Sequence, residues 1–142
     1  MGGPDRQLRE AAVELLVNVD VDDLDKAIDF YRAALGLTLK RRLFDDTVAE
    51  MAGASSPVFL LQKDAGSRAS ATVRSRRDYG RHWTPVHLDV VVVDVAAAVA
   101  RARAAGANLE GEVQTHEWGR IAFMADPFGH GFCLVQFLAR GY

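Results

Sequence analysis

The first half of the chain alternates short apolar runs with one helical stripe. Residues 13–21 are rich in Val and Leu and are typical of a strand. Apolar residues at helical spacing predict a helix after this strand, capped by Asp22 or Asp23 and ended by Gly36. This half is therefore predicted to be β-α-β-β-β. Its last three strands are expected at 38–44, 47–51 and 57–62.

The second half repeats the same order. A strand over 87–93 precedes an alanine-rich helix that Asp94 caps and that runs through Ala105, with Gly106 ending it. Asp23 and Asp94 lie 71 residues apart. The glycines that end the helices, Gly36 and Gly106, lie 70 residues apart, and this nearly constant offset indicates an internal duplication. The remaining strands are expected at 109–114, 120–125 and 131–137.

Composition narrows the class of protein. A length of 142 residues with 49% hydrophobic content fits one domain with a sizeable core. A net charge of −2 argues against a strongly basic nucleic-acid binder. Met1–Glu10 lack an apolar signal core, and aspartates interrupt every run that approaches membrane-spanning length. The single cysteine, Cys133, excludes an intrachain disulfide. We expect a soluble cytoplasmic protein without a nucleic-acid or membrane partner.

The two halves are predicted to be modules at about 12–65 and 83–138, joined by a basic loop at 66–82. Residues 63–84 around this loop hold six basic side chains against two acidic ones. A solvated connection is the favoured interpretation, with Trp83 anchoring the loop. The alternative is an arginine-lined lid over an anionic ligand.

Two motifs resemble a known family. Asp23-Leu-Asp-Lys-Ala-Ile-Asp-Phe-Tyr31, followed by Leu35-Gly36-Leu37, resembles the opening signature of the vicinal oxygen chelate superfamily. That superfamily includes glyoxalase I, bleomycin-resistance proteins, fosfomycin-resistance enzymes and extradiol dioxygenases. Asp126-Pro-Phe-Gly-His130 resembles the turn before the family's last strand. The resemblance covers residues 13–137. It implies an α+β fold of two β-α-β-β-β modules, whose curled mixed sheets enclose a cavity, and a homodimer.

The resemblance also implies where a metal would bind, on the first and last strands of each half. Leucine cannot donate a lone pair, so two of the four positions are lost, and we expect no metal and no other cofactor. A rescue by Glu14, His87 and Asp89 is the alternative, but it needs coordinated shifts of register. The four positions, counted from the motifs, are Leu16, Leu60, His87 and Cys133.

Strand alternation places further candidates in the cavity. His87 and Asp89 share one face and could move a proton as a catalytic pair, or simply satisfy each other. If Phe123 and its alternate neighbours face the helix, Trp118, Arg120 and Met124 face the cavity. Trp118 and Arg120 then suit a planar, anionic ligand. Alternatively, Trp118 covers the end of the sheet and Arg120 pairs with a surface carboxylate.

These residues predict a protein that binds a small organic molecule, for example by sequestering an antibiotic-like compound. The first alternative is a glyoxalase-like lyase or isomerase acting on a small carbonyl compound, either metal-independent or with non-standard metal ligands. The second is a regulatory or structural subunit with a filled cavity. The ligand-binding residues are expected to be Leu16, Leu60, Gln62, His87, Trp118, Arg120, Met124 and Cys133.

Overall fold

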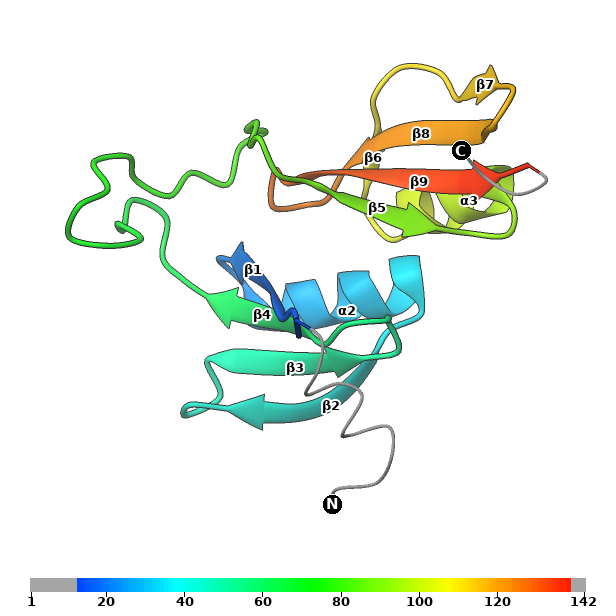
Figure 1. Cartoon of the computed structure of the whole chain (residues 1–142). Helices are drawn as coiled ribbons and strands as arrows, with labels where there is room; N and C mark the ends of the chain where they lie inside the picture. Colours follow the sequence, from blue (N-terminus) through cyan, green and yellow to red (C-terminus); the bar gives the residue numbers. More distant parts are fainter. Residues whose placement is uncertain (1–12, 139–142) are drawn as a thin grey trace.

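The computed structural model describes residues 13–138 and contains two sheets, each with one helix on it. Figure 1 shows the first sheet (blue to green) below the second (green to red). The helices of the two modules pack against each other. The expectation for Met1–Glu10 and the module boundary at residue 12 lie outside the described residues. The α+β class with two curled mixed sheets is confirmed.

The first module has the predicted order. Its helix begins after Asp23, whose Oδ1 accepts a hydrogen bond from the Lys26 amide at 3.1 Å, and ends at Gly36 in the left-handed region with φ 72°. The sheet order is β1-β4-β3-β2, with β1 parallel to β4. The elements are β1 (Val17–Val21), α2 (Leu24–Leu35), β2 (Thr38–Leu43), β3 (Val48–Ala52) and β4 (Val58–Gln62).

The second module follows the same plan with one irregularity. Its sheet order is β5-β9-β8-β6, and β7 also pairs with β8. The single strand predicted at 109–114 is wrong, because the segment forms two short pieces on either side of Gly111, which has a φ of 82°. The elements are β5 (Leu88–Val91), α3 (Val95–Ala104), β6 (Asn108–Leu109), β7 (Gln114–His116), β8 (Gly119–Ala125) and β9 (Gly131–Phe137).

A glutamine near the end of each module's last strand caps that module's helix. Gln62 Oε1 accepts a hydrogen bond from the Leu24 amide at 3.2 Å, and Gln136 Oε1 accepts one from the Val95 amide at 2.8 Å. Amides in the first turn of a helix have no partner within the helix, so a strand side chain can satisfy them. The shared contact extends the internal duplication from element order to side-chain bonding.

The two family-like motifs touch each other across the modules. The Tyr31 hydroxyl on α2 donates to Asp126 Oδ2 at 2.5 Å. Asp126 Oδ1 also accepts from the amides of Phe128 and His130, at 2.8 and 2.9 Å. Burial, followed by the charge of Asp126, raises the pKa of Tyr31 well above its usual range. This contact ties the turn before β9 to the helix of the first module.

None of the helices within residues 13–138 is long and apolar enough to span a membrane.

Candidate functional site

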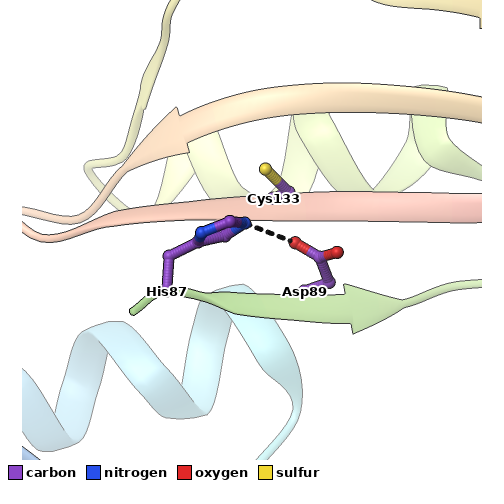
Figure 2. A group of neighbouring side chains, drawn as sticks. All are labelled: His87, Asp89 and Cys133. Carbon is purple, nitrogen blue, oxygen red and sulfur yellow. Dashed lines mark ion pairs between the residues drawn. The ribbon is translucent and has the colours of Figure 1, made fainter. Parts of the chain in front are cut away.

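Three potential metal ligands gather on the open face of the second sheet. Asp89 on β5 and Cys133 on β9 are register partners, and strand partners project their side chains to the same side. His87 immediately precedes β5, and its Nε2 lies 3.1 Å from Asp89 Oδ1. Figure 2 shows the three side chains converging. Their ligand atoms all lie within 4.8 Å of one another.

The protonation state of Cys133 limits the chemistry of this cluster. Cys133 is 3% exposed, and burial together with the Asp89 carboxylate raises the pKa of its thiol to about 11. The thiol therefore stays protonated near neutral pH. A protonated thiol is a poor nucleophile, so Cys133 is not activated for covalent chemistry in this state. The half-exposed His87 is then the group able to accept a proton from a bound molecule.

Two neighbouring hollows open beside His87. The smaller, of about 170 Å³, has Trp83, Phe123, Phe132 and Cys133 in its wall. The larger, of about 540 Å³, lies between the modules. His87 and Thr84 line both hollows. The wall of the larger hollow includes Leu16, Asn18, Tyr31, His82 and His130.

The predicted cavity residues of the first module lie in different environments. Leu16 precedes β1, is 61% exposed and lines the larger hollow. Leu60 is fully buried in the core, so its expected facing is wrong. The register shows why: the β1 residue equivalent to Asp89 is Asn18, and its partner on β4 is Phe59. The position predicted on β4, Leu60, is one residue away from Phe59, which is the equivalent of Cys133. A shift of one residue moves a side chain to the opposite face of the sheet. Gln62, as described above, is used as a helix cap.

The predicted facing of β8 is also reversed. Met124 is 1% exposed and packs in the core, although it still touches the smaller hollow, whereas Phe123 is 40% exposed and faces that hollow. Arg120 pairs in register with Gln136, which caps α3, so Arg120 lies on the helix side of the sheet. Trp118 stacks on His116 with ring centroids 5.2 Å apart. Among the described residues, Trp118 and Arg120 line neither of these two hollows.

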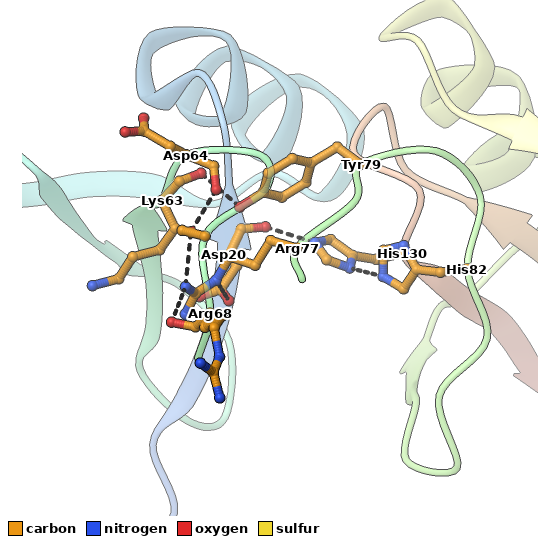
Figure 3. Close-up of polar contacts among 9 residues, drawn as sticks. Asp20, Lys63, Asp64, Arg68, Arg77, Tyr79, His82 and His130 are labelled. Atoms are coloured by element: carbon orange, nitrogen blue, oxygen red, sulfur yellow. Dashed lines mark hydrogen bonds and ion pairs between the residues drawn. The ribbon is translucent and has the colours of Figure 1, made fainter. Parts of the chain in front are cut away.

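The basic loop folds back onto the first module. Arg77 Nε lies 2.7 Å from Asp20 Oδ2 and its Nη1 donates to the Arg68 carbonyl at 3.1 Å. The Tyr79 hydroxyl donates to the Lys63 carbonyl at 2.8 Å. Figure 3 shows these contacts around Asp20. These bonds use the loop's polar groups within the chain and favour the connecting-loop interpretation over an open cationic lid.

The end of the loop contributes a wall that the sequence analysis missed. Trp83 is 79% exposed and lines the smaller hollow, so it does not anchor the loop as expected. The sequence signal that could have identified Trp83 is its position four residues before His87. Arg81 pairs with Glu110 at 2.6 Å, and both residues border the same hollow. The role of Phe123 could not be found without the register of β8.

Comparison with known proteins places the chain in a family. The model of the glyoxalase-like domain family matches residues 16–135, so this chain belongs to that family. The resemblance to the vicinal oxygen chelate superfamily is thereby confirmed. The chain is 34% identical over 122 residues to the anthracycline biosynthesis protein DauV of Streptomyces sp. (strain C5). That match covers 84% of this chain but only 40% of DauV.

Solved structures show the same fold. TnmS3, an antibiotic binding protein from Streptomyces sp. CB03234, has a TM-score of 0.62 and 25% identity, over 89% of this chain and 97% of TnmS3. TioX from Micromonospora sp. ML1 has a TM-score of 0.67 and 21% identity, over 89% of this chain and 100% of TioX. Small-molecule binding thus occurs among proteins with this architecture.

Proposed function

We propose that this protein binds a small planar organic molecule in the two hollows beside His87 and thereby sequesters it. The observation that carries the proposal is the wall of the smaller hollow, where Trp83, Phe123 and Phe132 stand beside His87 and the Arg81–Glu110 ion pair. Apolar and aromatic walls with a small number of fixed polar groups are typical of ligand sites. The antibiotic binding of TnmS3 and the biosynthetic role of DauV support this ligand class.

His87 sets the polar end of this ligand. It lines both hollows and its ring is held by Asp89, so it can hydrogen-bond a carbonyl or carboxylate group. Leu16 contributes apolar surface to the larger hollow, and Cys133 lines the smaller one. The ligand is therefore a planar molecule with a carbonyl or anionic group.

A titration with anthraquinone carboxylate tests the proposal, using Trp83→Ala and, as matched control, Trp118→Ala. Binding is expected to raise Tm, by a stabilisation of about 2.7 kcal/mol at a hundredfold excess over Kd. Trp83→Ala should weaken binding about fivefold, since stacking is worth about 1 kcal/mol. Trp118→Ala should leave Kd unchanged. A loss confined to Trp118→Ala would place the ligand at the far end of β8, with Trp118 and Arg120.

We also propose that the protein is a homodimer in which a second copy covers the open sheets. Within residues 13–138, β1 and β5 each form an edge of their sheet. Beside them Val86, Val91 and Val93 are largely exposed, which is costly for a monomer. Light scattering at micromolar concentration should report twice the chain mass, and a stable monomer would reject the assembly. The buried free thiol of Cys133 suits a cytoplasmic role, which cell fractionation would test.

A second candidate function, a metal-dependent lyase or isomerase for a small carbonyl compound, is favoured by the cluster of His87, Asp89 and Cys133. Imidazole nitrogen, carboxylate oxygen and thiolate sulfur are all zinc ligands, and three of them leave a position open. The donor set therefore fits Zn²⁺, provided that the thiol gives up its proton on binding. A bound zinc ion would polarise a carbonyl oxygen. The sequence analysis expected no metal because Leu16 and Leu60 occupy two of the four family positions; the cluster found here uses Asp89 in addition to His87 and Cys133.

Titration with Co²⁺ as a spectroscopic stand-in for Zn²⁺ tests this candidate. One equivalent per chain with a thiolate charge-transfer band is expected, and Cys133→Ser and His87→Ala should each abolish the band. His116→Ala is the matched control, because His116 is exposed and lies beside Trp118. Binding far below one equivalent would reject the metal candidate and leave ligand binding standing.

A further inference from the structure

Two histidines join the end of the basic loop to the turn before β9. His82 Nε2 lies 2.9 Å from His130 Nδ1. The outer nitrogens contact backbone carbonyls: His82 Nδ1 is 2.9 Å from the Gly80 oxygen, and His130 Nε2 is 2.6 Å from the Asp20 oxygen. Figure 3 shows the two rings in series beside Asp20. The chain of contacts thus runs from the loop through the turn to β1.

The three contacts of the histidine pair require an odd number of ring protons. A carbonyl oxygen can only accept, so His82 Nδ1 and His130 Nε2 must both carry hydrogen. Two neutral rings would then present bare lone pairs to each other across the central 2.9 Å contact. All three hydrogen bonds form only when the pair holds three ring protons, which gives it one positive charge. Loss of that third proton removes the central bond.

Several charged and titratable groups face the pair. The Asp20 carboxylate lies on the same β1 residue whose carbonyl His130 contacts, but it is paired with Arg77. Asp126 Oδ1 accepts from the His130 amide, and Arg81 contacts the His82 carbonyl. The Tyr79 ring packs edge-on to His130, and burial followed by the charge of Asp20 raises the pKa of Tyr79 to about 12. His87 lines the same larger hollow.

The backbone around the pair is built for close contact. The His82 amide donates to the Gly129 carbonyl at 3.1 Å. Gly129 has a φ of 83°, and a Cβ there would clash with the Gly80 carbonyl oxygen. The next residues along the loop, Trp83 and Thr84, line the ligand hollows. Holding His82 on the turn therefore holds this wall in place.

We propose that His82 and His130 form a proton-dependent latch, which fastens the loop end (residues 79–84) to the turn (residues 126–130) at low pH and releases it as pH rises. The latched form binds one more proton than the released form, so by linkage a fall in pH favours the latch, by up to about tenfold per pH unit. A latched wall is preorganised and binds ligand more tightly. This consequence for binding rests on the proposed function, whereas the latch itself does not.

Nitrogen-15 NMR of the histidine rings and backbone tests the latch between about pH 5.5 and pH 8.5, the range in which histidine changes charge. At the acid end we expect a proton on each of the two outer nitrogens and one shared between the two central nitrogens. The amide resonances of Gly80, His82 and Gly129 should move together as the third proton is lost. Resonances that stay fixed across this range would overturn the proposal.

The variant His82→Gln separates the latch from other titrations. A glutamine amide can donate to His130 Nδ1 without an extra proton, so the amides of Gly80 and Gly129 should become insensitive to pH. His116→Gln is the matched control and should keep the wild-type response, since His116 lies beside Trp118. An equal pH response in His82→Gln and wild type would reject the latch.

Binding of anthraquinone carboxylate, measured over the same pH range, completes the test. Kd of the wild type should rise at least threefold more than that of His82→Gln as the latch opens, because pH effects from groups outside the pair are common to both proteins. A pH-dependent NMR response without any binding supports the latch and counts against the proposed function. Binding with equal pH dependence in both proteins supports the function and rejects control by the latch.

Discussion

The two modules share a backbone plan but differ in what their open faces offer. On the second sheet Asp89 and Cys133 are register partners, and on the first sheet the equivalent partners are Asn18 and Phe59. An ionisable pair in one module thus corresponds to an amide and a phenyl ring in the other. The duplicated scaffold determines where side chains project, and only their identity determines which face can carry chemistry.

The same contrast holds one step before each first strand. His87 and Leu16 each stand seven residues before the aspartate that caps their module's helix. The imidazole can bind a proton, a metal or a polar ligand group, whereas the leucine contributes only apolar surface. Both line the larger hollow. The comparison shows one site with a polar half and an apolar half, rather than two equivalent sites.

The largest expected effect distinguishes two leucines that the sequence pattern treated alike. Leu60→Ala should lower the free energy of unfolding by about 2–5 kcal/mol, because Leu60 is fully buried and its loss leaves a cavity. Leu16→Ala should change it by about 0.5 kcal/mol or less, since Leu16 is 61% exposed. Urea denaturation of both variants measures the difference. Equal losses would mean that β4 has the opposite facing.

The thiol on the second sheet should react slowly. At about pH 8 a pKa near 11 rather than the ordinary 9.0 lowers the thiolate fraction of Cys133 about a hundredfold. The rate of modification by a disulfide reagent should therefore be at least that much lower in the folded protein than in urea. Asp89→Asn, which removes the neighbouring carboxylate charge, should recover part of the rate. Equal rates in native buffer and urea would contradict the buried placement.

The contact between the modules should make stability depend on alkaline pH. Tyr31→Phe removes a buried hydrogen bond to a carboxylate and should cost about 1.5–3 kcal/mol. The raised pKa of Tyr31 determines the direction in which stability changes with pH. Its contribution is complete below about pH 10 and declines above it, where an unfolded tyrosine ionises but the folded one does not. Urea titrations at several pH values should show a smaller alkaline decline in Tyr31→Phe than in wild type.

The smallest expected effect tests the symmetry of the caps. Gln62→Ala and Gln136→Ala should each lower the free energy of unfolding by about 1 kcal/mol, because each leaves a first-turn amide without its side-chain partner. Thermal denaturation of the two single variants and the double variant measures this. The costs should be additive, since the caps serve different helices. A cost at only one glutamine would show that the duplication does not extend to the caps.

Most of the fold could be predicted because its signals are local. Asp94 and Gly36 begin or end a helix as predicted, and Asp23 is the cap among the two aspartates considered, because each of these residues acts on neighbours within a few positions. The error at 109–114 is also instructive, because the bend at Gly111 separates two pieces that both pair with β8. Local apolar pattern could not show that interruption.

Much less of the candidate site could be predicted, because the register of strand pairing decides to which face of the sheet each side chain projects. His87 and Asp89 lie together as their spacing indicated, 3.1 Å apart. The facing of Leu60 and Met124 was reversed, since a single residue of shift exchanges the two sides of a strand. Trp83 was assigned to the loop, whereas the structure exposes it beside the smaller hollow.

The sequence by itself determined the two-module plan, the family and the ionisable residues of the second module, because these follow from composition, spacing and motifs. Only the tertiary structure decided that Asp89 meets Cys133, that His82 meets His130, and that Tyr31 meets Asp126. Two of these pairs lie more than 40 residues apart in sequence, and the third is separated by 95. Their meeting depends on strand pairing and on how the modules pack, which no local pattern specifies.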